Sequence, residues 1–168
     1  MLFNSFEFIF LFLPAILLVY WNIYGSNKQR IITLTIFSYI FYGFWDYRFT
    51  VLMLSCTILN YYCGKKIAFT NNKKLKKLWL SVALILSLGV LAYFKYYNFF
   101  SNSINGMLSI MGVQGLIPTL NIILPVGISF YTFQALSYTI DIYRNDIRPC
   151  KQLITFACFV SLFPQLIA

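Results

Sequence analysis

The stretch from Ile122 to Arg144 constrains the fold most, because it is apolar and long yet carries polar groups along one face. A helix of about 20 residues spans the hydrocarbon core of a bilayer. Positions three and four residues apart share one face of a helix. The small and polar residues follow that spacing: Gly127, Tyr131, Gln134, Tyr138 and Asp141. Because an amide or a carboxylate finds no partner in lipid, we expect this polar face to turn toward other helices or a wet cavity.

Two interpretations of the polar face are open at this stage. Small and polar residues commonly hold membrane helices together without any chemical role. Alternatively, the face lines the path of a substrate. At its end, Asp141 and Arg144 lie three residues apart, which predicts an ion pair that stabilises the bundle and takes no part in a reaction.

The composition identifies an integral membrane protein and removes much of the usual chemistry. Of 168 residues, 60% are hydrophobic and 10% are charged, against about 25% charged in soluble domains. Histidine, the commonest general base and metal ligand, does not occur. The four carboxylates form no evident acid–base pair, and the four cysteines lack metal-site spacing. We therefore expect free thiols, and neither a catalytic residue, a metal site nor a bound cofactor in this chain.

Apolar segments separated by short polar ones predict an all-α fold, a polytopic transmembrane bundle of about five to six helices. We expect the 168 residues to form a single membrane domain. The stretch 98–121 contains several glycines, and its apolar residues have a helical spacing, so it is either an amphipathic surface helix or a re-entrant hairpin. The expected spans are 6–24, 31–45, 49–63, 78–97, 122–144 and 152–168.

The basic residues predict the topology. Six of the thirteen lie between Lys65 and Lys77, a clustering that argues against nucleic acid as a partner. With the N-terminus outside, the segments expected inside are 25–30 with a charge of +2, 64–77 with +6 and 144–151 with +2, while the rest of the chain carries −1. Short loops rich in Lys and Arg stay in the cytoplasm. We therefore expect the N-terminus outside and the Lys-rich loop 64–77 in the cytoplasm.

Two sequence runs, LPVGISFYTFQALSYTIDIYR at 124–144 and FPQLIA at 163–168, resemble the membrane-bound O-acyltransferase family. Within it, the chain is most similar to the bacterial branch that acetylates exported polysaccharides such as alginate. Four upstream runs extend the resemblance over the whole chain: MLFNSFEFIFLFLP at 1–14, SYIFYGFWDYRF at 38–49, NYYCGKKI at 60–67 and YFKYYNFF at 93–100.

The resemblance implies a multi-pass enzyme of the bacterial inner membrane. Such an enzyme moves an acyl group from a thioester donor, acetyl-CoA or an acyl carrier, toward a hydroxyl acceptor outside. Its partners would be the lipid bilayer and extracytoplasmic proteins of polysaccharide acetylation. The family's histidine, on a later helix, has no counterpart here. We therefore expect an N-terminal portion that is inactive without a C-terminal half. The motif positions that match are candidates for funnel wall or scaffold: Gln134, Tyr138, Asp141, Arg144 and Gln165.

Other functions stay open on the sequence alone. A related membrane acyltransferase that transfers D-alanine to teichoic acid would use the same fold. A non-enzymatic membrane scaffold subunit would suit a chain without histidine.

Overall fold

Backbone groups inside a bilayer must bond within the chain, and a helix achieves this locally. The computed structural model describes residues 5–22, 27–44, 46–110, 118, 120 and 122–165, and within these ranges every regular element is helical. The elements are a π-helical turn η1 (Phe8–Phe12), α1 (Leu13–Asn22), α2 (Asn27–Gly43), α3 (Tyr47–Phe69), α4 (Lys73–Ile110), α5 (Ile128–Arg144) and α6 (Leu153–Ser161).

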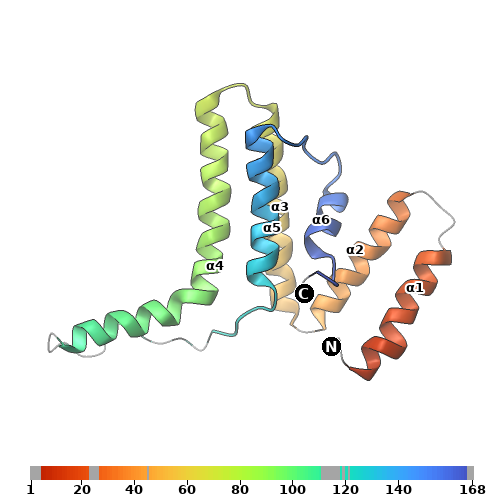
Figure 1. The fold of residues 1–168 in the computed structure, drawn as a ribbon, viewed down its shortest axis with the longest axis horizontal. Coiled ribbons are helices and arrows are strands. Elements are labelled where there is room, and N and C mark those ends of the chain that lie inside the picture. The colour runs from red at the N-terminus through yellow and green to blue at the C-terminus, as the bar shows by residue number, and fades with distance from the viewer. Residues whose placement is uncertain are drawn as a thin grey trace.

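Helix α3 lies at the centre of the arrangement. It packs against α5 and against the first part of α4, while α2 packs against α6 (Figure 1). Helix α1 lies beyond α2 at the edge. The main core contains Met53, Ile67, Tyr131 and Phe156, each at most 1% exposed. Of the residues on the polar face of α5, Tyr131 and Tyr138 are buried against other helices of the same chain.

A second, aromatic cluster joins both ends of the described chain. The rings of Phe8 and Phe12 contact Phe41 of α2 and Phe163, which follows α6. The Phe163 N–H also donates to the Ser38 hydroxyl at 3.3 Å. The π-helical turn η1 immediately precedes α1, in which Pro14 is the second residue.

The helix expected over 122–144 begins later than predicted, at Ile128. Residues 122–127 are not helical, because Pro125 cannot donate a backbone hydrogen bond and Gly127 adopts a left-handed conformation with φ of 72°. Gly127 therefore precedes the polar face as the N-cap residue. At the other end, Asn145 ends the helix in the left-handed region with φ of 66°.

The Lys-rich loop predicted for 64–77 is much shorter in the structure. Residues 64–69 continue α3, residues 73–77 begin α4, and only 70–72 connect the two helices. Asn72 caps the start of α4, because its side-chain Oδ1 accepts from the Lys74 N–H at 2.9 Å. The lysines thus occupy the last turns of α3 and the first turns of α4.

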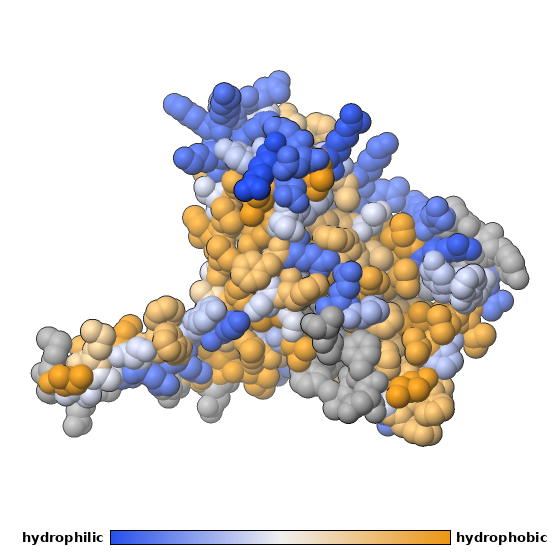
Figure 2. Space-filling model, in the orientation of Figure 1, coloured by the Kyte–Doolittle hydropathy of each residue, from blue (hydrophilic) through white to orange (hydrophobic). Residues whose placement is uncertain are grey.

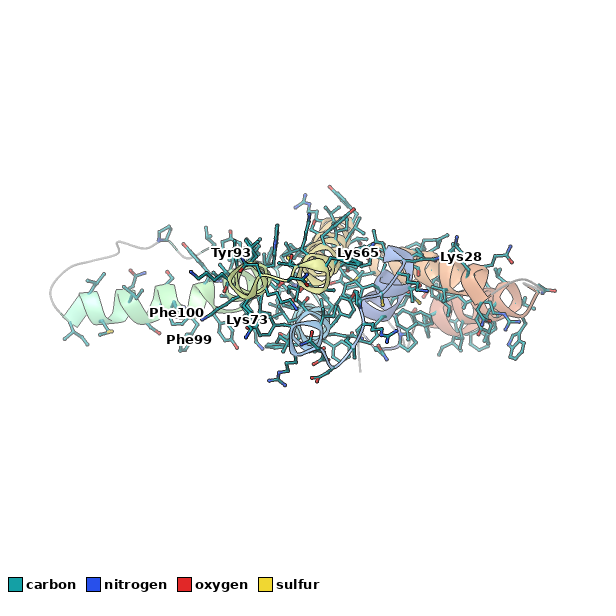
Figure 3. All side chains as sticks on the ribbon, turned by 90° about the horizontal axis from the view of Figure 1, so that it is seen from above. Lys28, Lys65, Lys73, Tyr93, Phe99 and Phe100 are labelled. Atoms are coloured by element: carbon teal, nitrogen blue, oxygen red, sulfur yellow. The ribbon has the colours of Figure 1, made fainter. Side chains whose placement is uncertain are left out.

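Helix α4 is longer than the predicted span 78–97, because residues 98–110 continue the same 38-residue helix. These residues form an arm that bends away from the other helices, and Phe99 and Phe100 lie on it (Figures 1 and 3). The Asn98 side chain holds the returning chain, donating to the Leu120 carbonyl at 2.7 Å and accepting from its N–H at 3.1 Å. The remainder of the predicted stretch, 111–117, 119 and 121, lies outside the described residues.

Helix α6 is shorter than the predicted span 152–168. It has nine residues, and the chain turns at 163–165. This is well below the length of about 20 residues that crosses a bilayer. Among the helices described, Lys73–Ile110 meets the length and apolarity of a membrane span, and Phe8–Asn22 is a shorter apolar segment. The all-helical prediction is confirmed for the described ranges, and the number of crossings stays a prediction.

Candidate functional site

The polar face of α5 finds most of its partners within this chain. Tyr138 is buried on that face, and its hydroxyl accepts from the Cys150 N–H at 3.0 Å. Its ring packs on Phe156 of α6, with centroids 4.2 Å apart. From α3, the Tyr61 hydroxyl donates to the Lys151 carbonyl at 3.0 Å. Two tyrosines on different helices therefore fix the backbone immediately before α6.

Gln134 and Gln165, two of the predicted motif residues, meet in the structure. The Gln134 Nε2 donates to the Phe159 carbonyl at 2.8 Å and to Gln165 Oε1 at 3.2 Å. The Gln134 Oε1 is buried and has no donor among the described residues. This amide joins α5 to the end of α6, and it keeps one acceptor available.

Tyr131 lies at the start of the polar face, 1% exposed. Its ring meets Tyr42 of α2 edge-on, with centroids 6.4 Å apart, and Tyr42 donates its hydroxyl to the Val126 carbonyl at 2.7 Å. The Tyr131 hydroxyl itself is buried and finds no hydrogen-bond partner of good geometry in the part of the chain described.

Asp141 and Arg144 lie in the last turn of α5, and the structure contains no ion pair between them. The Asp141 backbone carbonyl instead accepts from the Asp146 N–H at 2.9 Å, which closes the end of the helix. Arg144 is exposed. An exposed pair of this kind contributes little, about 0–1 kcal/mol, while holding two side chains in place costs entropy.

Asn60 of α3 is a buried polar residue that links three helices. It is 0% exposed, its Nδ2 donates to the Ser87 hydroxyl of α4 at 3.0 Å, and its Oδ1 accepts from Thr139 of α5 at 2.9 Å. One side chain thus connects α3, α4 and α5. Thr139 lies one position beyond Tyr138, outside the spacing that defined the polar face.

Gly64, which sequence analysis did not single out, allows α5 to approach α3 closely. A Cβ at this position would lie 2.9 Å from the Ile142 Cδ1 and 3.0 Å from the Tyr138 Cε1. A glycine inside an apolar helix is the signal that could have indicated it, since small residues mark close helix contacts in membranes.

The basic side chains gather at one end of the bundle. The starts of α2 and α4 and the ends of α3 and α5 lie at this end, and its surface is hydrophilic (Figures 1 and 2). Lys65 and Lys73 lie there (Figure 3). The Lys65 ammonium also lies 4.6 Å from the centroid of the Tyr61 ring. All three segments predicted to be cytoplasmic therefore share one end of the molecule.

Chemically, this site can bind and position but supplies no reacting pair. Its groups are phenols, amides and hydroxyls, and the chain has no histidine. No cluster of three metal-ligating side chains occurs within the described ranges, and all four cysteines are free thiols. The polar face of α5 is closed mainly by helices of the same chain.

Comparison with known proteins finds relatives that are named for acetylation of alginate or peptidoglycan. The chain is 42% identical over its full length to a probable alginate O-acetylase of Pseudomonas syringae and 41% identical to that of Pseudomonas aeruginosa. It is 32% identical to a peptidoglycan O-acetyltransferase of Helicobacter pylori, again over the full chain.

In each comparison the chain spans about a third of the relative: 32% of the two alginate proteins and 36% of the Helicobacter protein. No family model matches the sequence, and no solved structure matches it. Over its whole length the chain is thus homologous to the N-terminal part of the alginate O-acetylases, which confirms the resemblance to the membrane-bound O-acyltransferase family.

Proposed function

We propose that this chain forms the N-terminal part of a membrane O-acyltransferase that acetylates an exported polysaccharide. The observation that carries the proposal is identity of about 40% over every part of the chain to proteins named for alginate O-acetylation. The Helicobacter relative, named for peptidoglycan, supports a glycan acceptor in general. Because these relatives are about three times longer, the activity belongs to the larger protein and the chain's share is a structural one.

In this reaction, an acceptor hydroxyl oxygen attacks the carbonyl carbon of an acyl thioester, the carbon–sulfur bond breaks, and the thiol leaves. A general base must take the hydroxyl proton, and a chain without histidine is poorly equipped for that task. We assign to α5 the role of a wall beside the acceptor path. Gln134 and Gln165 are the residues we propose to face it, because their amides meet at the end of α6 and Gln134 retains an unpaired acceptor.

The membrane placement follows from the distribution of charge. Large apolar side chains are exposed along the helices, among them Ile85 at 70% and Phe133 at 55%. The hydrophilic surface lies over the lysine-bearing end (Figure 2). We propose that this end faces the cytoplasm, that the N-terminus lies outside, and that the helices cross the bacterial inner membrane.

Reporter fusions test this topology. Alkaline phosphatase, active only outside the cytoplasm, is expected to be active when fused after Asp46 and inactive when fused after Thr70, because the intervening α3 would cross the membrane. A fluorescent protein that matures only in the cytoplasm provides the complementary readout at both positions. The reverse pattern, or the same compartment for both fusions, would contradict the proposed orientation.

A chimera tests the proposed function. The corresponding third of the Pseudomonas aeruginosa alginate O-acetylase is replaced by this chain, and the chimera is expressed in an alginate-producing strain that lacks its own enzyme. We expect acetyl ester to return to the exported alginate. The measurement is ester content of the secreted polymer by infrared or proton magnetic resonance.

The matched control is the same chimera carrying Gly64→Leu, which we expect to restore no ester because α5 can no longer pack on α3. A chimera that reaches the membrane in normal amounts, remains folded in detergent and yet restores no ester would count against an acyltransferase role. The chain would then be better described as a membrane scaffold that shares the fold.

A further inference from the structure

Two neighbouring cavities form one groove between α3 and α4. The deeper has a volume of about 270 Å³ and reaches α5, and the shallower has about 370 Å³ and opens near the start of α3. Leu52 lines both. Along α3 the groove extends from Asp46 to Leu59, about 20 Å at 1.5 Å per residue. It thus covers more than half of the bilayer's hydrocarbon thickness, which is about 30 Å.

The mouth of the groove carries one charge of each sign. Asp46 is half-buried and Arg48 is exposed, and both line the shallower cavity together with Tyr93. Asp46 and Arg48 lie at the start of α3, which is at the end of the bundle opposite to the start of α4 and its lysines (Figure 1). A cation and an anion side by side fit a zwitterionic headgroup, with the guanidinium toward a phosphate and the carboxylate toward an ammonium.

The inner part of the groove fits the hydrocarbon chain of a lipid with such a headgroup. Most of its surface is apolar, and it opens sideways past Ser55 and Leu86, which are exposed. Tyr131 of α5 lies at the inner end of this cavity as one of its lining residues. Headgroup and hydrocarbon chain would therefore meet matching groups in that order.

We propose that the groove between α3 and α4 holds one zwitterionic glycerophospholipid of the phosphatidylethanolamine type. Its headgroup lies between Asp46 and Arg48, and one acyl chain enters past Leu52 toward Tyr131. The lipid fills space between the two helices. This proposal requires only that the chain lies in a membrane, so it is independent of the proposed acetyl transfer.

The test is lipid retention by the full chain, purified from bacterial membranes in a mild detergent and measured by native mass spectrometry with lipid extraction. We expect about one phosphatidylethanolamine for each chain, in excess over phosphatidylglycerol. Leu52→Trp, which places an indole where the two cavities join, is expected to reduce retention at least tenfold. Leu54→Trp is the matched control, because Leu54 is exposed on α3 and lines neither cavity.

Arg48→Gln keeps the test informative if Leu52→Trp fails to fold, because Arg48 is exposed and outside the core. It is expected to lower the preference for phosphatidylethanolamine over a neutral diacylglycerol at least tenfold while the chain stays folded. Equal retention of phosphatidylglycerol, no retained lipid on a folded chain, or equal loss with Leu54→Trp would each overturn the proposal. So would a groove found covered by another helix of the larger protein.

Discussion

Gly64→Leu is expected to lower the free energy of unfolding of the bundle by about 1–3 kcal/mol. Even a Cβ atom at this position would lie 2.9 Å from the Ile142 Cδ1 and 3.0 Å from the Tyr138 Cε1. Both neighbours are buried, at 2% and 5% exposure, so they have little room to move. Relief of the overlap requires α3 and α5 to separate.

The measurement is thermal unfolding in detergent, followed by size-exclusion chromatography of the heated samples. Gly89→Leu is the control, because Gly89 also lies within an apolar helix and a Cβ there would meet nothing within 4 Å. We expect that variant to be as stable as the parent or slightly more so, since leucine favours a helix over glycine by up to about 1 kcal/mol. Equal melting temperatures for the two variants would show that α3 and α5 do not pack as described.

The second large effect is expected from Asn60→Leu, which should lower the free energy of unfolding by about 1–2 kcal/mol. Interhelical hydrogen bonds in membranes average about 0.6 kcal/mol each, and this change removes the two that join Asn60 to Ser87 and Thr139. The upper value applies if the Ser87 hydroxyl is left without its donor, since a buried unsatisfied group costs about 1–3 kcal/mol. Thr139 loses less, because its hydroxyl also lies 3.3 Å from the Ala135 carbonyl.

A double-mutant cycle with Thr139→Val isolates the bond between α3 and α5. In the Thr139→Val background, Asn60→Leu should cost less than in the parent, because one of its bonds is already gone. Ser55→Ala provides the control on the same helix, since Ser55 is exposed and bonds only to the Val51 carbonyl of its own helix. If the losses in free energy of unfolding from Asn60→Leu and Thr139→Val were strictly additive, the two residues would not share a hydrogen-bond network.

The sequence indicated the helical fold and the need of the polar face for partners, because both depend on local spacing and residue type. It did not indicate which helices would provide those partners. Tyr138 bonds to Cys150, twelve residues away, and Thr139 bonds to Asn60, seventy-nine residues away. Contacts at such distances depend on how the helices pack, and no periodic pattern in one segment contains that information.

The errors in element boundaries have physical causes as well. The predicted helix began at Ile122 because the sequence is largely apolar from Ile122 to Tyr143. In the structure, residues 122–127 are not helical, since Pro125 and Gly127 prevent helical geometry there. The opposite happened at Asn98, where polar residues suggested a break and the helix continued to Ile110. For α6, apolarity alone predicted a full span, yet the helix ends after nine residues.

The short helix α6 is anchored on every side. Tyr61 and Tyr138 hold the backbone before it, Gln134 holds the Phe159 carbonyl within it, and Ser38 holds Phe163 after it. These four hydrogen bonds attach α6 and its flanking residues to α2, α3 and α5. A displacement of any of these three helices would therefore be expected to move α6 as well.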